Sequence, residues 1–133
     1  MTPSAVQMTR GKSLMRMVLA MLFFGLLFAA PASGQNVGGN YAVSGTNPNG
    51  STYTGAAEIA WTPKACRITW RIGMSTSEGF CMATAKAVAA FYRLGNSFGL
   101  VVYDVQPNGV LAGYWRVLDQ EGIGGEILTP RTN

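Results

Sequence analysis

Six carboxylates and two cysteines are the side chains of this sequence best suited to chemistry, as acid–base pairs, metal ligands or a redox pair. The carboxylates are Glu58, Glu78, Asp104, Asp119, Glu121 and Glu126. Their spacing supports no glycosidase-like pair, and Asp119 with Glu121 is better explained as a solvated turn than as half of a cation site. The chain contains no histidine, which removes the commonest metal ligand and the usual base of a nucleophilic site. With no phosphate loop or dinucleotide fingerprint either, we expect no catalytic residue, no metal, no cofactor and no enzymatic activity.

The two cysteines fall opposite each other in a predicted hairpin. Gly73-Met74 can form a two-residue type II′ turn, in which glycine supplies the positive φ of the first position. Pairing outward from this turn brings Cys66 directly opposite Cys81, where Cβ atoms lie about 4.5–5.5 Å apart. The sequence therefore predicts a Cys66–Cys81 disulfide; a pair of buried free thiols is the alternative.

The same register gathers charged side chains on the other face of the hairpin. Arg67 falls near Phe80, and Glu78 lies diagonally between Arg67 and Arg71. Most such clusters are solvated and contribute little to stability. We keep Arg67, Arg71 and Glu78 as a candidate partner-binding surface.

Aromatic residues on the predicted strands could line a ligand pocket in the mouth of a barrel. They are Trp61, Trp70, Trp115, Tyr53, Tyr103 and Tyr114. Because each lies on a regular strand face, an ordinary core is the favoured interpretation. Small residues predicted to face inward would leave room for a cavity; these are Gly55, Ala57, Ala112 and Gly113.

Two-fold alternation of apolar and polar residues between turn signals predicts about eight strands. Their approximate ranges are 41–44, 52–61, 65–72, 75–83, 83–92, 98–106, 110–118 and 125–128. The alanines of 83–92 also permit a helix, but Val88, Phe91 and Tyr92 favour a strand. Short connections make sequence neighbours pair. We therefore expect an all-β fold, a small up-and-down antiparallel barrel, with a two-sheet sandwich as the alternative.

The N-terminal segment has the three parts of a secretory signal peptide. Basic residues at 10, 12 and 16 precede an apolar run over 17–30, and Ala30-Pro31-Ala32 offers a cleavage site. The run is shorter than the roughly 20 residues of a membrane-spanning helix, although an uncleaved anchor is the alternative. We expect a signal peptide over 1–32, cut after Ala32 or Gly34, export to the periplasm or beyond, and no stable membrane span afterwards.

The mature chain is predicted to be one small domain. Residues 33–40 form a flexible, Gly-rich lead-in, 41–130 the β domain and 131–133 a tail. Removing the three basic residues of the signal lowers the net charge of +4 to +1. The basic character therefore belongs mostly to the targeting segment, and we expect no nucleic-acid partner.

Turn motifs and strand cores between 39 and 130 carry a family resemblance. They are Gly39-Asn40-Tyr41 with Val43, Gly45-Thr46-Asn47-Pro48-Asn49-Gly50-Ser51, Tyr53-Thr54-Gly55, Ile68-Thr69-Trp70 with Ile72-Gly73, Gly99-Leu100-Val101-Val102-Tyr103, Gly109 with Leu111 and Gly113, and Leu128-Thr129-Pro130. The chain resembles a family of small exported proteins found mainly in proteobacteria, many of them labelled fibronectin-binding protein. The resemblance implies an extracellular or periplasmic protein-binding role and attaches no catalytic residues. The chain departs from the family pattern over Phe80–Tyr92, where relatives look more Gly-rich.

We expect an exported, non-enzymatic binding module that engages a protein partner, such as fibronectin, through loops or a sheet edge. One alternative is a barrel that binds a small apolar ligand in an aromatic interior. Another is an inhibitor of a periplasmic enzyme. The Arg- and Thr-bearing strands disfavour an outer-membrane barrel.

Overall fold

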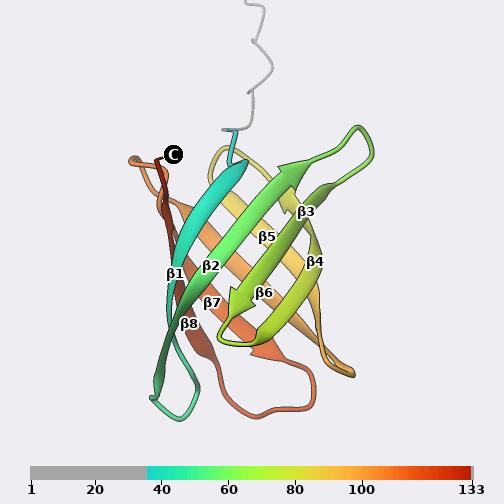
Figure 1. Cartoon of the computed structure of the whole chain (residues 1–133), viewed down its shortest axis with the longest axis vertical. Helices are drawn as coiled ribbons and strands as arrows, with labels where there is room; N and C mark the ends of the chain where they lie inside the picture. The colour runs from blue at the N-terminus through green and yellow to red at the C-terminus, as the bar shows by residue number, and fades with distance from the viewer. Residues whose placement is uncertain (1–35, 133) are drawn as a thin grey trace, which may run out of the picture. The chain divides into compact units, whose positions relative to one another are not determined.

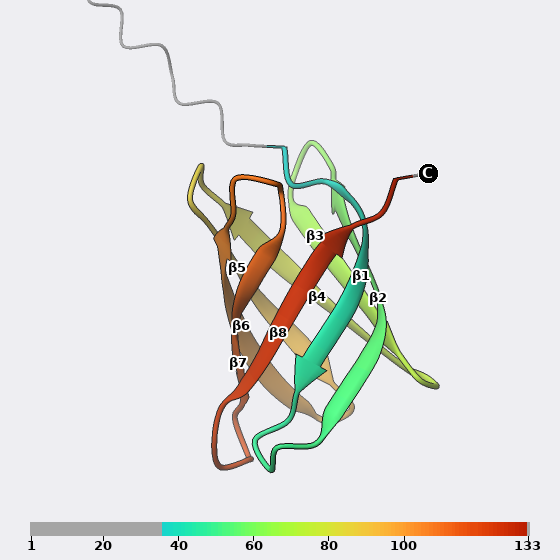
Figure 2. The same cartoon turned by 90° about the vertical axis from the view of Figure 1, so that its left-hand side faces the viewer.

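The computed structural model describes residues 36–132, which form a closed barrel of antiparallel strands (Figures 1 and 2). The strands are β1 (Gly39–Thr46), β2 (Thr52–Trp61), β3 (Cys66–Ile72), β4 (Ser75–Ala83), β5 (Ala87–Leu94), β6 (Ser97–Val105), β7 (Leu111–Val117) and β8 (Gly124–Pro130). Each strand pairs with the next along the chain, and β8 pairs with β1 to close the barrel. The predicted up-and-down barrel is confirmed, and the sandwich alternative is excluded by the closure.

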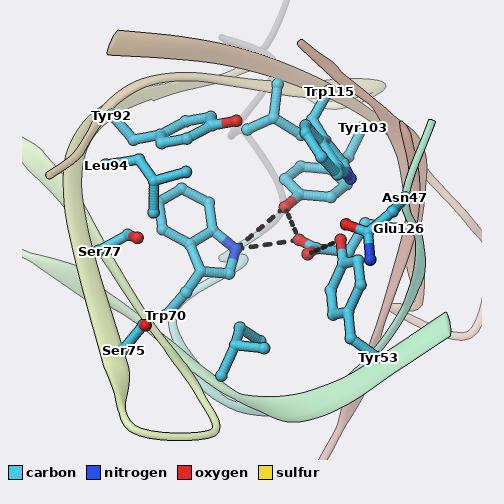
Figure 3. Close-up of a pocket in the computed structure, with 12 residues that line it drawn as sticks. Asn47, Tyr53, Trp70, Ser75, Ser77, Tyr92, Leu94, Tyr103, Trp115 and Glu126 are labelled. Carbon is cyan, nitrogen blue, oxygen red and sulfur yellow. Dashed lines mark hydrogen bonds between the residues drawn. The ribbon is translucent and has the colours of Figure 1, made fainter. Parts of the chain in front are cut away.

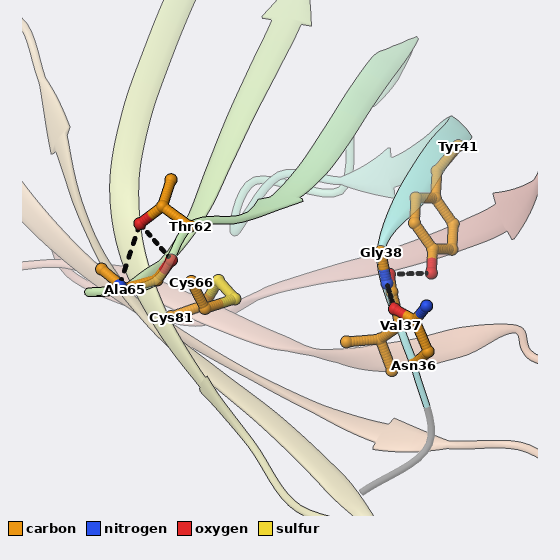
Figure 4. Close-up of a disulfide and its surroundings, with 8 residues drawn as sticks. All are labelled: Asn36, Val37, Gly38, Tyr41, Thr62, Ala65, Cys66 and Cys81. Atoms are coloured by element: carbon orange, nitrogen blue, oxygen red, sulfur yellow. Dashed lines mark hydrogen bonds between the residues drawn. A yellow bond between two sulfur atoms is a disulfide. The ribbon is translucent and has the colours of Figure 1, made fainter.

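Three predicted segments lie wholly or partly outside the described residues. They are the signal peptide over 1–32, the lead-in up to residue 35 and the last residue of the tail over 131–133. The rest of the lead-in is more ordered than the sequence suggested, since β1 begins at Gly39 and Val37 is buried with 4% of its surface exposed. The Tyr41 hydroxyl donates a hydrogen bond of 2.5 Å to the Val37 carbonyl, which holds this segment against the barrel end (Figure 4).

The segment that also permitted a helix is a strand. β5 starts at Ala87, after a turn in which the Thr84 hydroxyl oxygen accepts hydrogen bonds from the amides of Lys86 and Ala87. Val88, Ala90 and Tyr92 alternate inward and are buried, as a strand period requires. Among residues 36–132 we find no helix long and apolar enough to cross a membrane.

The predicted disulfide is confirmed near the end of the barrel where the chain enters β1 (Figure 4). Cys66 pairs with Cys81 in the β3–β4 ladder, with their Cα atoms 4.9 Å apart and both side chains buried. Gly73 has a φ of 58° and Met74 does not have a positive φ, which fits the type II′ turn expected at this position. The register set by that turn therefore brings the two sulfurs together.

The turns of the barrel divide between its two ends. The β1–β2, β3–β4, β5–β6 and β7–β8 connections lie at one end, the lower end in Figure 1, and we call it the hairpin end. The other end carries the disulfide and Val37. Buried apolar side chains fill that half of the interior, including Ile59, Ile68 and Val88. These side chains pack the interior at that end, where a second cavity of about 260 Å³ lies beside Val37, Tyr41 and Val105. What fills the hairpin end decides whether the barrel can hold a ligand between its aromatic side chains.

Candidate functional site

A cavity of about 260 Å³ opens at the hairpin end of the barrel (Figure 3). Asn47, Ser75 and Leu94, which lie next to three of the turns, line its mouth. Its deeper walls are made by five aromatic side chains and one carboxylate: Tyr53, Trp70, Tyr92, Tyr103, Trp115 and Glu126. The cavity is therefore largely apolar, with a few polar atoms pointing into it, as is usual for small-molecule sites.

Glu126 on β8 is the centre of the polar group. It is the only polar or charged residue counted in the buried core of the described chain, with 7% of its surface exposed. The Tyr53 hydroxyl donates to its Oε2 at 2.8 Å, while the Tyr103 hydroxyl and Trp70 Nε1 donate to its Oε1 at 2.5 and 3.0 Å (Figure 3). These bonds join β8 to β2, β3 and β6 across the interior.

The buried surroundings of Glu126 raise the pKa of this carboxyl and of three nearby tyrosines. Burial raises the pKa of the Glu126 carboxyl above its ordinary value of 4.5, and the hydrogen bonds from Tyr103, Tyr53 and Trp70 partly oppose this effect. Burial, followed by the nearby Glu126 charge, also raises the pKa of the Tyr53 and Tyr103 phenols, and it raises the pKa of Tyr92 to about 12. No lysine or arginine of the described range lines the cavity. Neutral donors alone therefore hold this carboxylate.

The aromatic walls are arranged as two pairs on different sides of the cavity (Figure 3). The ring centroids of Tyr53 and Trp115 lie 6.4 Å apart at an edge-on angle, and those of Trp70 and Tyr92 lie 5.2 Å apart at a tilt. The indole Nε1 of Trp115 is buried and makes no hydrogen bond of regular geometry among the described residues, although its nearness to the Tyr53 hydroxyl partly opposes the rise in the pKa of that phenol. Because buried indole N–H groups normally find an acceptor, this atom is a further polar point available to a ligand.

The structure separates the six aromatic residues that the sequence grouped together. Tyr53, Trp70, Tyr103 and Trp115 do line the cavity. Trp61 is 50% exposed at the far end of β2, and Tyr114 is 73% exposed on the outside of β7. The expectation of a core position is wrong for these two, because Trp61 lies at the end of its strand and Tyr114 alternates outward next to the inward Trp115.

Two of the six residues in the deeper walls were not recognised as such in the sequence. Tyr92 was part of the segment that also permitted a helix, and Glu126 was noted only as an isolated acid. The signal that could have found Glu126 is its place between Gly124 and Leu128, which are both buried on the inner face of β8. Alternation alone puts this carboxylate inside the barrel.

The prediction that four small residues face the interior of the barrel and leave room for a cavity is confirmed in part. Ala57 is buried, and a Cβ on Gly55 or Gly113 would lie within 2.3 Å of a neighbouring backbone oxygen, so these glycines permit close strand approach. Ala112 was expected to face inward, but it follows the buried Leu111 and takes the outward face.

The charged residues singled out in the hairpin lie outside the barrel. The ladder pairs Arg67 with Phe80, Thr69 with Glu78 and Arg71 with Thr76, as the predicted register required. The Arg67 guanidinium lies over the Phe80 ring at 5.3 Å. These charges therefore belong to the outer surface and take no part in the cavity. Residues 36–132 also contain no cluster of cysteine and acidic side chains that could hold a metal.

The outside of the barrel carries an apolar area, the β4–β7 face. It consists of Phe80, Met82, Phe91, Phe98, Leu100, Val102 and Tyr114, whose exposed fractions range from 42% to 79%. The ladders place Phe80, Phe91 and Leu100 in one row across neighbouring strands. At roughly 200 Å² for each large side chain, these fractions amount to about 800 Å² of apolar surface, more than the roughly 300–600 Å² of the largest patch on a typical monomer.

Comparisons with known proteins bear on the fold. No family model matches the chain, and no curated protein matches it. A solved structure described as a redesigned beta barrel is similar, with a TM-score of 0.60 and 15% sequence identity over 73% of this chain and 92% of that chain. At this identity the likeness concerns the barrel architecture alone.

Proposed function

We propose that this protein is a binding barrel that takes a small, largely apolar ligand into the cavity at its hairpin end. The observation that carries the proposal is an open cavity of about 260 Å³ lined by aromatic rings and reaching the Glu126 carboxylate. Protein interiors rarely leave voids much larger than a water molecule. A cavity of this size with convergent polar atoms is therefore better explained by a ligand than by imperfect packing.

The polar atoms of the cavity restrict the ligand. Glu126 Oε2 accepts one hydrogen bond from Tyr53 in the structure and has capacity for a second. Trp115 Nε1 has a hydrogen to donate. A ligand with one group that donates and one that accepts would satisfy both atoms. The volume lies just below the roughly 300–1,000 Å³ of sites for drug-sized molecules, so the ligand is small.

Export forms the second part of the proposal. It is supported by the three-part pattern of the N-terminal segment and by the Cys66–Cys81 disulfide, a bond that persists in oxidising compartments. The protein would act outside the cytoplasm as a carrier or sensor of its ligand. The absence of an acid–base pair in the sequence supports a non-enzymatic role.

The direct test is a native mass spectrum of the protein purified from the envelope of its own host. Extra mass of a few hundred daltons or less that leaves on denaturation is expected, and its identity would name the ligand. A matched pair of variants locates it: Ser77→Leu adds a large side chain at the cavity wall, whereas Thr76→Leu adds the same group on the outer face. Loss of the extra mass in the first variant alone is the expected result; a bare wild-type protein contradicts the proposal.

A protein-binding role is the second candidate, and the β4–β7 face is the observation that favours it. Its area of about 800 Å² matches one side of a standard protein interface. Arg67 and Arg116 flank its central row at the two ends. The partner that fits is a protein with an apolar centre bordered by acidic residues. The family resemblance suggests a matrix protein such as fibronectin.

Purified fibronectin immobilised on a sensor surface tests this second candidate. Leu100→Lys places a charge in the middle of the face, and Thr69→Lys places the same charge outside it. Binding that Leu100→Lys lowers at least tenfold and Thr69→Lys leaves unchanged would support a docking role. Equal binding by both variants would remove this face as the docking site, and no binding by the wild type would remove fibronectin as the partner. A concentration-dependent dimer would identify a second copy as the occupant.

A further inference from the structure

The charge of the cavity is the feature that says most about its ligand. Within residues 36–132, Glu126 is the only ionisable carboxylate that lines it, and no basic side chain of that range does so. The three groups that contact this carboxylate, two phenols and an indole, are neutral, and burial raises the pKa of both phenols so that they keep their protons. When Glu126 is ionised, the cavity therefore has a negative charge that hydrogen bonds disperse but that nothing neutralises.

The aromatic walls add to the same potential. The face of an aromatic ring is electron-rich and attracts cations that come within about 6 Å of its centre. Tyr53 with Trp115 and Trp70 with Tyr92 border the cavity from different sides (Figure 3). A group that enters between them meets several ring systems at once, and Glu126 lies beside the same space.

We propose that the ligand of this cavity is a small organic cation, an amine or quaternary ammonium held between the two aromatic pairs and against the Glu126 carboxylate. This inference rests on the proposed ligand-binding function and adds the sign of the ligand's charge. A cation supplies the counter-charge that the walls lack. Its alkyl groups pack on the rings, where a neutral polar molecule would lose its hydration without gaining an ionic partner.

The competing explanation is that Glu126 serves only as a hydrogen-bond acceptor that aligns three aromatic residues. An uncharged acceptor would do that equally well. In Glu126→Gln the amide oxygen can accept from Trp70 and Tyr103, while the amide nitrogen can donate to the Tyr53 oxygen. The substitution therefore keeps the shape of the network and its bonds from Trp70 and Tyr103, reverses the direction of the Tyr53 bond and removes the charge.

Calorimetric titration of the protein with its disulfide intact tests the proposal with three probes at pH 8. Choline is the cation, 3,3-dimethylbutan-1-ol is its neutral isostere of nearly the same shape, and indole reports on the cavity as an apolar site. We expect choline to bind at least about tenfold more tightly than the isostere. The reason is that only the cation can make a desolvated cation–π contact with the rings and an ionic contact with Glu126. Glu126→Gln should lose most of this ratio and keep its affinity for indole.

The outcomes separate the two proposals. Equal affinity for choline and its isostere, or binding of indole alone, overturns the cationic ligand while leaving a ligand-binding barrel in place. A tenfold preference that survives unchanged in a folded Glu126→Gln protein overturns the role given to the carboxylate. If none of the probes binds, the cationic ligand is also overturned, and a bare mass for the host-derived protein then removes the ligand-binding function as well. Should Glu126→Gln fail to fold, the wild-type comparison of the isosteres still decides the charge.

Discussion

Trp115 lies directly opposite Gly124 in the β7–β8 ladder, and its indole ring occupies the space that a side chain at 124 would need. A Cβ built on Gly124 would come within 2.1 Å of Trp115 Cε2. Two further pairs repeat this arrangement in other ladders, Tyr53 on Gly45 and Tyr92 on Gly99. Three of the five aromatic side chains that line the cavity therefore pack against a glycine directly opposite them in the ladder. This arrangement fixes both the position of the ring and the register of the strands.

Adding a methyl group at Gly124 should displace the Trp115 ring. We expect Gly124→Ala to lower the free energy of unfolding by about 1–3 kcal/mol, the usual cost of forcing extra volume into a packed site. Gly125→Ala is the matched control, because the nearest atom to a Cβ at that position lies 4.0 Å away. Guanidinium unfolding measures the difference, and near-ultraviolet circular dichroism reports on the indole. Equal stabilities of the two variants would mean that the ring is not fixed by its glycine.

Removing the Glu126 side chain should cost more than removing its charge. In Glu126→Ala the Tyr53 and Tyr103 hydroxyls lose their acceptor, whereas Trp70 Nε1 keeps the Tyr103 oxygen at 3.2 Å. One buried hydroxyl, on Tyr103, and one part-buried hydroxyl, on Tyr53, are left without an acceptor, which should lower the free energy of unfolding by about 2–4 kcal/mol.

The comparison with Glu126→Gln removes the charge while an amide keeps a contact with Tyr53, Tyr103 and Trp70. This variant should be at least as stable as the wild type at pH 8, because a buried ionised carboxylate without a counter-ion is costly. Denaturant unfolding of the three proteins side by side gives both differences. A Glu126→Gln protein as unstable as Glu126→Ala would show that the network requires the charge.

Strand order, the disulfide and the turn at Gly73 could be predicted from the sequence because each depends on local rules. Alternation marks strands, a two-residue turn fixes the register, and the register brings Cys66 opposite Cys81. The cavity could not be predicted in this way. Whether an inward aromatic fills the core or borders a space depends on which residues from non-adjacent strands reach the same level of the barrel.

The contact between Tyr53 and Glu126 illustrates this limit, because the two residues are 73 positions apart and their strands, β2 and β8, are not neighbours in the sheet. Only closure of the barrel, with its shear, brings them together. Trp61 and Tyr114 show the converse. Their types suggested the interior, but position at a strand end and outward alternation place them in solvent.

The disulfide should stabilise the barrel without affecting the cavity. It closes a loop of 15 residues at the end opposite the cavity mouth, and a loop of that length is worth about 3 kcal/mol of unfolding free energy. We expect a reductant to lower the stability of the wild type by about this amount and to leave a Cys66→Ala/Cys81→Ala double variant unchanged. Ligand affinity in the reduced, folded protein should be unaltered. A loss of affinity on reduction would show that the two ends of the barrel are coupled.

The pH dependence of stability should carry the signature of Glu126. Because the folded protein raises the pKa of this carboxyl above 4.5, the folded state holds a proton in a range where the unfolded chain has already released it. The free energy of unfolding therefore falls as the pH rises from about 4.5 toward the raised pKa, with a slope of at most about 1.4 kcal/mol per pH unit, and is level above it. The groups facing the carboxyl do not interfere, since the pKa values of Tyr53, Tyr92 and Tyr103 are raised and Trp70 does not titrate.

Other carboxylates titrate in the same range, so the measured quantity is the unfolding free energy of the wild type minus that of Glu126→Gln. This difference should decrease between pH 4 and the raised pKa of Glu126 and then remain constant up to pH 9. A saturating cationic ligand should reverse the trend, because it binds the ionised form more tightly and adds stability as the carboxyl loses its proton. A difference that rises with pH in the ligand-free protein would mean that the hydrogen bonds from Tyr53, Tyr103 and Trp70 outweigh burial. Glu126 would then be ionised at all physiological pH values, and the cavity would carry its negative charge throughout that range.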